Sequence, residues 1–129
     1  GFCLVGSEMC IRDRFRTEEL MKNGIKEVSD LRDKSLNIHL ADKSSQFNTA
    51  RVEALELLNL IEVAEATAIS ANERKESRGA HSREDYPDRD DENWLKHSIY
   101  FSDTKQVSKR DVNFRPKQVQ AFQPIVRTY

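Results

Sequence analysis

The stretch of residues 48–74, NTARVEALELLNLIEVAEATAISANER, decides the fold of this chain. Apolar residues recur along it at the three- and four-residue spacings of an amphipathic helix. They form one broad stripe: Val52, Leu55, Leu58, Ile61, Ala64, Ala68, Ile69 and Ala71. Because this arc is wider than one partner helix can cover, we expect the helix to be the most buried element and to pack against at least two neighbours.

The residues just before this helix predict how it begins. Asn48 is a favourable N-cap, because its side-chain oxygen can accept a hydrogen bond from a free amide of the first turn. Phe47 and Val52 then occupy the positions of a hydrophobic staple, in which the two side chains pack against each other. We therefore expect Phe47 to lie over the first turn.

A first helix is predicted upstream, beginning after Thr17. Thr17 is a favourable N-cap, and Glu18 and Glu19 follow it in the first turn, where the helix dipole favours acids. The apolar residues of this helix again keep to one stripe: Leu20, Ile25, Val28 and Leu31. The helix should fade at residues 34–37, and the polar residues up to Gln46 should connect it to the second helix.

Downstream of the long helix, residues 76–91 interrupt the helical pattern at Gly79 and Pro87. This segment is rich in arginine, histidine, tyrosine and aspartate, so we expect an ordered loop rather than a plain spacer. A helical turn that carries Trp94 should follow at residues 91–96.

The last third of the chain predicts a hairpin and a tail. Residues 98–101 and 107–114 have the composition of short strands, with a turn at 102–105 between them. Two prolines lie in residues 115–129, which should be extended.

Composition excludes several classes of protein. The 129 residues suffice for one domain, and the net charge of −1 gives no overall basic field for nucleic acid or an anionic membrane. No apolar run approaches the length of a bilayer span. The four glycines are too scattered for a phosphate-binding loop, which needs clustered glycines.

Residues 1–14, GFCLVGSEMCIRDR, are set apart from the rest. The stretch LVGSEMCIRD resembles a translated sequencing adaptor, so we expect residues 1–14 to be an artefact that makes few contacts, and we exclude them from functional reasoning. Both cysteines, Cys3 and Cys10, lie there. The remaining sequence therefore offers no disulfide, thiolate nucleophile or cysteine-based metal site.

The titratable residues give no strong metal motif. His39, His81 and His97 are too far apart in sequence for a recognisable ligand set, and a structural role for each is favoured. The spacing of Asp88, Asp90 and Glu92 is weakly similar to a calcium loop, but the turn glycine and the closing glutamate are absent. We expect the acids of residues 84–92 to cap the next helical turn or to pair with nearby arginines: Arg74, Arg78, Arg83 and Arg89.

Two further segments raise functional alternatives. The last 27 residues carry six bases and two acids among several aromatic residues, a pattern that single-strand nucleic-acid binders share. A strand pair and tail docked on a larger protein is the favoured alternative, because the overall charge is balanced. Arg78 and His81 are the most enzyme-like pair, since arginine binds carboxylates and histidine moves protons, but no nucleophile accompanies them.

Four segments together resemble a known family. They are FNTARVEALEL at 47–57, ATAISA at 66–71, ESRGAHSREDYP at 76–87 and RDDENWLKH at 89–97. They closely resemble the C-terminal domain of the succinate dehydrogenase and fumarate reductase flavoprotein subunit. The likeness runs from about residue 15 to the final RTY, which is typical of the succinate dehydrogenase branch.

The resemblance implies an oxidoreductase with covalently attached FAD that oxidises succinate to fumarate and passes electrons through an iron–sulfur subunit to quinone. It also implies that the catalytic and substrate-binding residues, the flavin-bearing histidine and the dinucleotide fold lie upstream. We therefore expect no catalytic, cofactor-binding or metal-binding residue in this chain, and a structural role for Arg78 and His81. The fragment alone should be inactive.

The fold implied is mainly α: two long antiparallel helices of a truncated three-helix bundle, a long ordered loop, a short β-hairpin and an extended tail. The helical pair would occupy residues 15–75, the loop 76–97, and the hairpin and tail 98–129. Because one helix of the bundle would be missing, some of Leu57, Leu60 and Val63 should be unusually exposed.

The implied partners are the flavin and capping domains of the same subunit, the iron–sulfur subunit and the membrane anchor subunits. Neither nucleic acid nor direct membrane insertion is expected. The implied location is peripheral, at the cytoplasmic face of a bacterial inner membrane or the matrix face of a mitochondrial one. The alternatives are fumarate reductase or a related flavoprotein, and a non-catalytic helical interaction module.

Overall fold

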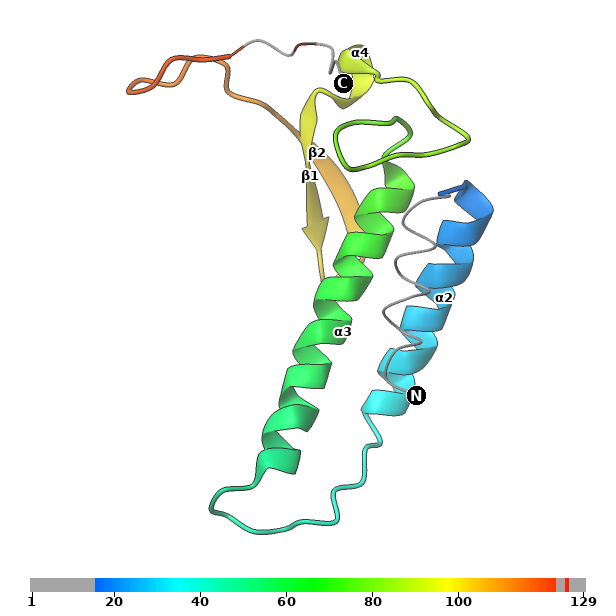
Figure 1. The fold of residues 1–129 in the computed structure, drawn as a ribbon, viewed down its shortest axis with the longest axis vertical. Helices are drawn as coiled ribbons and strands as arrows, with labels where there is room; N and C mark the ends of the chain where they lie inside the picture. The colour runs from blue at the N-terminus through cyan, green and yellow to red at the C-terminus, as the bar shows by residue number, and fades with distance from the viewer. Residues whose placement is uncertain (1–15, 123–124, 126–129) are drawn as a thin grey trace.

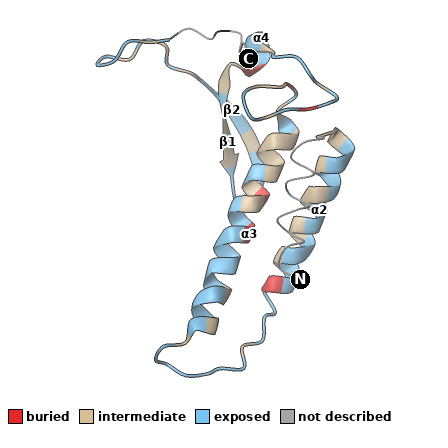
Figure 2. Ribbon diagram, viewed as in Figure 1, coloured by how far each residue is buried: buried red, intermediate tan, exposed pale blue. Residues whose placement is uncertain are grey.

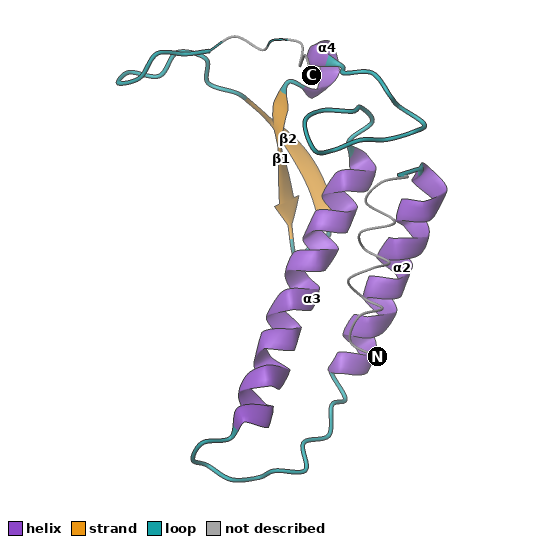
Figure 3. Cartoon of the chain, in the orientation of Figure 1, coloured by secondary structure: helices purple, strands orange, loops and turns teal. Residues whose placement is uncertain are grey.

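The computed structural model describes residues 16–122 and residue 125, so the expectation for residues 1–14 lies outside the described residues. Two long helices lie side by side and antiparallel, and a loop, a short helix and a β-hairpin gather at one end of the pair (Figure 1). The elements are α2 (Glu18–Ser35), α3 (Thr49–Glu73), α4 (Asp91–Trp94), β1 (Lys96–Phe101) and β2 (Gln106–Asp111). The mainly helical fold with a short hairpin is confirmed (Figure 3).

Both long helices begin at the expected caps. The Thr17 side chain accepts a hydrogen bond from the Leu20 amide at 3.4 Å, and the Asn48 side chain accepts one from the Arg51 amide at 2.8 Å. Each cap satisfies a backbone donor that has no partner within its helix. The helix starts are therefore set by local sequence.

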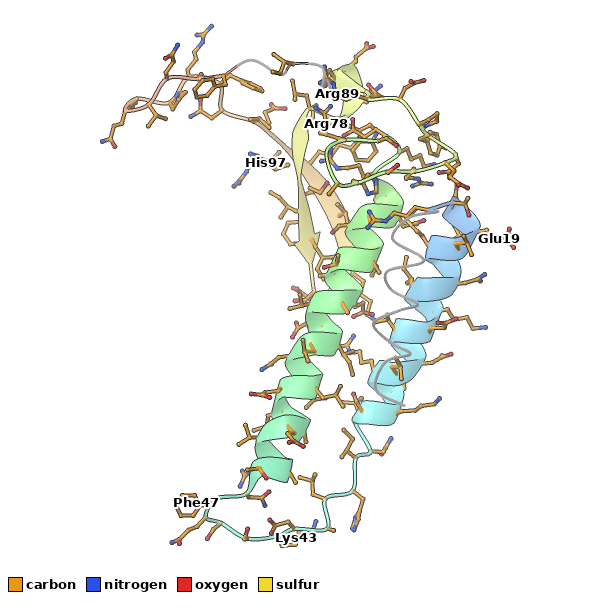
Figure 4. The ribbon with its side chains drawn as sticks, viewed as in Figure 1. Glu19, Lys43, Phe47, Arg78, Arg89 and His97 are labelled. Carbon is orange, nitrogen blue, oxygen red and sulfur yellow. The ribbon has the colours of Figure 1, made fainter. Side chains whose placement is uncertain are left out.

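The prediction of a hydrophobic staple between Phe47 and Val52 is wrong. Phe47 has a φ of +53° and its side chain is 99% exposed, while Val52 is also exposed. The Asn48 side-chain amide donates to the carbonyls of Asp42 and Ser44, which holds the connecting loop in a tight turn. Because the chain turns at Phe47 itself, the ring points away from the helix, at the tip of the pair (Figure 4).

The expectation that α3 is the most buried element is also wrong. Only Ile61 and Glu65 of α3 are buried, and exposed positions dominate its lower half (Figure 2). The reason is that α2 covers one side of α3 only and the hairpin contacts it near its C-terminal end. Leu57, Leu60 and Val63 are 41%, 66% and 65% exposed, so the expected exposure of this face is confirmed.

The hairpin forms with shifted boundaries. β1 and β2 pair antiparallel from Lys96↔Asp111 to Phe101↔Gln106, around a turn in which Lys105 takes a φ of +53°. The expected second strand continued to Phe114. It ends at Asp111 because β1 begins at Lys96, so the register leaves later residues without a pairing partner.

Candidate functional site

The loop after α3 is organised around a two-residue turn at Gly79. Arg78 N–H donates to the His81 carbonyl at 2.7 Å, and His81 N–H donates to the Arg78 carbonyl at 3.0 Å. Gly79 has a φ of +60°, a conformation that glycine adopts without steric cost. The turn thus brings together the two residues that the sequence singled out as enzyme-like.

Glu76 lies at the centre of the loop and has no exposed surface. Its Oε1 accepts hydrogen bonds from Arg74 Nη1 at 2.5 Å and from Arg78 Nε at 2.9 Å. Its Oε2 accepts from Arg78 Nη2 and from the Asp90 amide, each at 3.0 Å. Burial opposes ionisation of this carboxyl group, but the bonds from Arg78, the Asp90 amide and Arg74 outweigh it, and the pKa of Glu76 is lowered.

Arg78 takes part in this network through Nε and Nη2. Besides its forked contact with Glu76, its Nη2 donates to Asp91 Oδ1 at 2.5 Å and to the Asp90 carbonyl at 3.3 Å. The Glu76 hydrogen bond raises the pKa of Arg78, and the pKa of Asp91 is lowered, chiefly by Arg78. The expected pairing of Arg78 with the acidic run is confirmed, and no fork remains for a substrate carboxylate.

Arg74, the residue that ends α3, connects the loop to the hairpin. Its Nη1 donates to the Trp94 carbonyl at 2.9 Å, and its Nη2 donates to the Lys96 carbonyl at 2.6 Å and to Ser98 Oγ at 3.2 Å. The guanidinium lies 5.3 Å from the centre of the Trp94 ring, and Lys109 Nζ lies 3.3 Å from the same centre. Trp94 is therefore held by cation–π contacts with both side chains.

Arg83 is 1% exposed and holds the loop to the end of α3. It makes a forked contact with Asp85, at 2.8 Å and 2.5 Å, and donates to the Asn72 and Arg74 carbonyls at 2.8 Å and 3.3 Å. The Arg83 hydrogen bond is the main cause that lowers the pKa of Asp85. Tyr86 lies against the same guanidinium, 4.8 Å from ring centre to carbon.

His81 has both ring nitrogens occupied. Nδ1 lies 2.9 Å from Arg16 Nη1, which donates to it, and Nε2 lies 3.1 Å from the Arg74 carbonyl, to which it donates. Burial is the main cause that lowers the pKa of His81, and the charges of Arg16, Arg83 and Arg74 add to the effect. The ring therefore connects Arg16 to the end of α3 through two contacts that the neutral form can make.

The remaining acids of this region have structural roles of their own. Asp90 caps α4 by accepting from the Asn93 amide at 2.9 Å, and Arg89 contacts Asp91 at 2.9 Å. Arg78 and Arg89 lie close to α4, whereas His97 points away from the helices (Figure 4). Over residues 16–122, no cluster of three histidines, cysteines or carboxylates is arranged to hold a metal ion.

A second charged cluster, which the sequence did not lead us to expect, is centred on Glu65. This side chain is buried, and it accepts from Arg32 at 3.1 Å and from Lys105 at 2.6 Å. It thereby links α2, α3 and the hairpin turn. The available signal was the four-residue offset from Ile61, which places a carboxylate on the buried face of α3.

Two surface hollows lie along α2, away from this network. The first, of about 350 Å³, is open to solvent and lies along the outer face of α2. Its lining residues are Leu20, Asn23, Lys26, Glu27 and Asp30. In the part of the chain that the structure describes, no helix is both long and apolar enough to span a bilayer.

Comparison with known proteins identifies the family of this fold. The family model of the fumarate reductase flavoprotein C-terminus matches residues 13–129. A succinate dehydrogenase flavoprotein subunit of Coxiella burnetii is 52% identical over 110 residues, which are 85% of this chain and 19% of that protein. A fumarate reductase flavoprotein subunit of Haemophilus influenzae is 36% identical over 115 residues, covering 89% of this chain and 19% of that protein.

A solved structure of Escherichia coli quinol fumarate reductase agrees in three dimensions. It has a TM-score of 0.71 and 37% identity, and the match covers 84% of this chain and 19% of that chain. The chain spans about a fifth of the length of these relatives. The resemblance seen in the sequence is confirmed, and the chain belongs to the C-terminal domain family of succinate dehydrogenase and fumarate reductase flavoprotein subunits.

Proposed function

We propose that this chain is the C-terminal domain, residues 15–129, of the flavoprotein subunit of a succinate dehydrogenase. The complete subunit would oxidise succinate to fumarate and pass electrons through FAD and an iron–sulfur subunit to quinone. The assignment to this branch is supported by 52% identity with a succinate dehydrogenase subunit, against 36% and 37% for two fumarate reductase subunits.

Within that subunit, the domain would have a structural role. The observation that carries this proposal is that the hydrogen-bonding capacity of Glu76 is taken up within the chain. Each of its two carboxylate oxygens accepts two hydrogen bonds, from the loop and from Arg74 at the end of α3. Arg78 and His81 are likewise engaged with groups of this chain. A substrate carboxylate would have to break these contacts to bind there.

The described residues do not fit the FAD cofactor of the family. A flavin diphosphate needs clustered backbone amides or free cations, but Gly24 lies within α2 and Gly79 stands alone in its turn. The arginines of the loop are committed to Glu76, Asp85 and Asp91. We therefore propose that upstream domains hold FAD and that the isolated chain binds neither FAD nor succinate.

The exposed face of α3 is where the domain would meet the rest of its subunit. Leu57, Leu60 and Val63 present apolar side chains that a further helix could bury. The iron–sulfur and anchor subunits would then connect the subunit to the membrane. The proposal involves neither binding to nucleic acid nor direct insertion into the membrane.

The structural role is tested with Arg78→Ala in the complete subunit, purified beside Arg110→Ala. Arg110 lies on exposed β2 and serves as a control of matched charge. Arg78→Ala should reduce covalent flavin content or assembly severalfold while leaving the KM for succinate nearly unchanged. Normal flavin content with a large rise in KM would mean that Arg78 contacts substrate, and would overturn the proposal.

Fumarate reduction is the second candidate activity. It is favoured by the structural match to quinol fumarate reductase, with a TM-score of 0.71. Measuring the complete enzyme in both directions, with matched quinone and quinol, separates the two. A much faster rate with fumarate than with succinate would assign the chain to the reductases.

A further inference from the structure

The His81 ring lies between the ends of the two long helices. Arg16, immediately before the cap of α2, donates to Nδ1 at 2.9 Å. The backbone carbonyl of Arg74, the C-cap residue of α3, accepts from Nε2 at 3.1 Å. One imidazole therefore joins two segments that are 58 residues apart in the sequence (74 minus 16).

The backbone fixes the ring in this position. His81 closes the two-residue turn at Gly79 through a pair of hydrogen bonds with Arg78. The residue is half-buried, so the ring has little freedom to turn toward solvent. If the ring is protonated, the surrounding groups must therefore accommodate the charge without the ring turning to solvent.

Among the residues that the structure describes, three guanidinium groups act on the charge of the ring. Arg16 faces it from the segment before α2, Arg74 from the end of α3 and Arg83 from the loop itself. Two of these arginines have carboxylate partners of their own: Arg74 pairs with Glu76, which Arg78 also binds, and Arg83 pairs with Asp85.

Protonation would disrupt this arrangement in two ways. Nδ1 would become a donor directed at the Arg16 donor, so that hydrogen bond would be lost. A positive charge on the ring would also be repelled by the guanidinium groups of Arg16, Arg83 and Arg74. The surroundings of the ring thus favour its neutral form.

We propose that His81 is a pH-sensitive clasp, which holds the start of α2 against the 76–91 loop when neutral and releases it when protonated. Two neighbouring bonds would weaken on release. They are Glu84 N–H to the Arg16 carbonyl and Glu18 N–H to Asp85 Oδ2, each at 2.9 Å.

The direction of the pH dependence follows from the lowered pKa of His81. The unfolded or released ring binds a proton more readily than the held ring, so protons favour release. The clasp contributes its full stability above the ordinary histidine pKa of about 6.5. That contribution is lost as the pH falls through the lower pKa of the held ring.

The test uses hydrogen exchange with mass spectrometry on the complete subunit at pH 7.5 and 5.5, corrected for the intrinsic dependence of exchange on pH. The segments containing Glu18 and Glu84 should exchange severalfold faster at the lower pH. In His81→Gln this difference should disappear, because the amide cannot be protonated. His97→Gln, which changes an exposed histidine of β1, should retain it.

A second variant covers the case in which His81→Gln fails to fold. Arg16→Met removes the facing cation and the donor, so exchange at residues 16–18 should no longer depend on this pH step. Equal wild-type protection at both pH values would overturn the clasp. So would a pH dependence that survives in His81→Gln or in Arg16→Met. The proposal rests on the fold alone, and flavin content and succinate turnover do not enter the test.

Discussion

The loop end of the molecule and the lower half of the helical pair are stabilised in opposite ways. In the loop, charged side chains are the most buried, with Glu76 at 0% and Arg83 at 1% exposure. Along α3, apolar side chains such as Leu60 remain largely in solvent. The buried charges of the loop are paired within this chain, although Asn72 Oδ1 beside them has no hydrogen-bond partner, whereas the apolar side chains of α3 are left uncovered.

The difference follows from the nature of the two interactions. Hydrogen bonds are directional and saturable, so a loop of some twenty residues can satisfy a buried carboxylate with groups of its own. Hydrophobic stabilisation grows with the area removed from water, and two helices cannot cover the whole of α3. The comparison indicates that the loop can form within the chain while α3 needs a further neighbour.

The largest effect is expected from Glu76→Gln, which keeps the shape of the side chain and removes its charge. Arg74 and Arg78 would lose a buried counter-charge, and we expect a loss of about 3–5 kcal/mol in the free energy of unfolding. Denaturant titration followed by the fluorescence of Trp94, the single tryptophan, measures it. Asp88→Asn, in the same loop but exposed, should change stability by less than about 0.5 kcal/mol. Equal losses for both variants would refute the central role of Glu76.

Acid should weaken the loop through the same carboxylates. The pKa values of Glu76 and Asp85 are lowered in the folded chain, so the folded state binds fewer protons than the unfolded state. Their contribution is present above the unfolded values, about 4, and is lost as the pH falls through the folded values. The free energy of unfolding, measured from pH 6 to pH 3, should therefore fall less steeply in Glu76→Gln than in the wild type. Parallel profiles would contradict this.

A smaller effect is expected at the far end of the pair, where Asn48 caps α3. Asn48→Ala removes the acceptor for the Arg51 amide and should cost about 1 kcal/mol. Gln46→Ala, in the same connecting loop, is the matched control. Circular dichroism in a denaturant series measures both variants, and a loss confined to Gln46→Ala would show that the loop, not the cap, sets the start of α3.

The smallest effect on the chain itself should come from Leu60→Ser. Leu60 is 66% exposed, so the substitution should change the free energy of unfolding by less than about 0.5 kcal/mol. Sedimentation should nevertheless show less self-association, because exposed apolar surface promotes it. In the complete subunit the same change should cost clearly more. Equal costs in the two settings would mean that nothing covers this face.

Much of the local structure could be predicted from sequence. The caps at Thr17 and Asn48 and the helical turn of α4 follow from interactions between residues a few positions apart. The presence of a loop with a glycine turn was predictable for the same reason. The resemblance to the flavoprotein family was carried by the same stretches and is confirmed by the family model.

The failures all involve contacts or directions that local sequence does not set. Phe47 matched a staple in spacing, but the turn at its own backbone directs the ring outward. β2 ended early because the start of β1 limits the register. The burial of α3 was overestimated because an apolar stripe shows what can be buried, not what is available to bury it.

The sequence by itself determined the helices, their caps, the ordered loop and the family, because these depend on short spacings and on motifs read along the chain. Only the tertiary structure decided which charged and polar groups meet across long distances in the sequence. Glu65 meets Arg32 and Lys105, which lie 33 and 40 residues away, and His81 meets Arg16 across 65 residues. The physical reason is that a charge is satisfied by whichever opposite group the fold brings within about 3 Å, and sequence spacing does not specify that group.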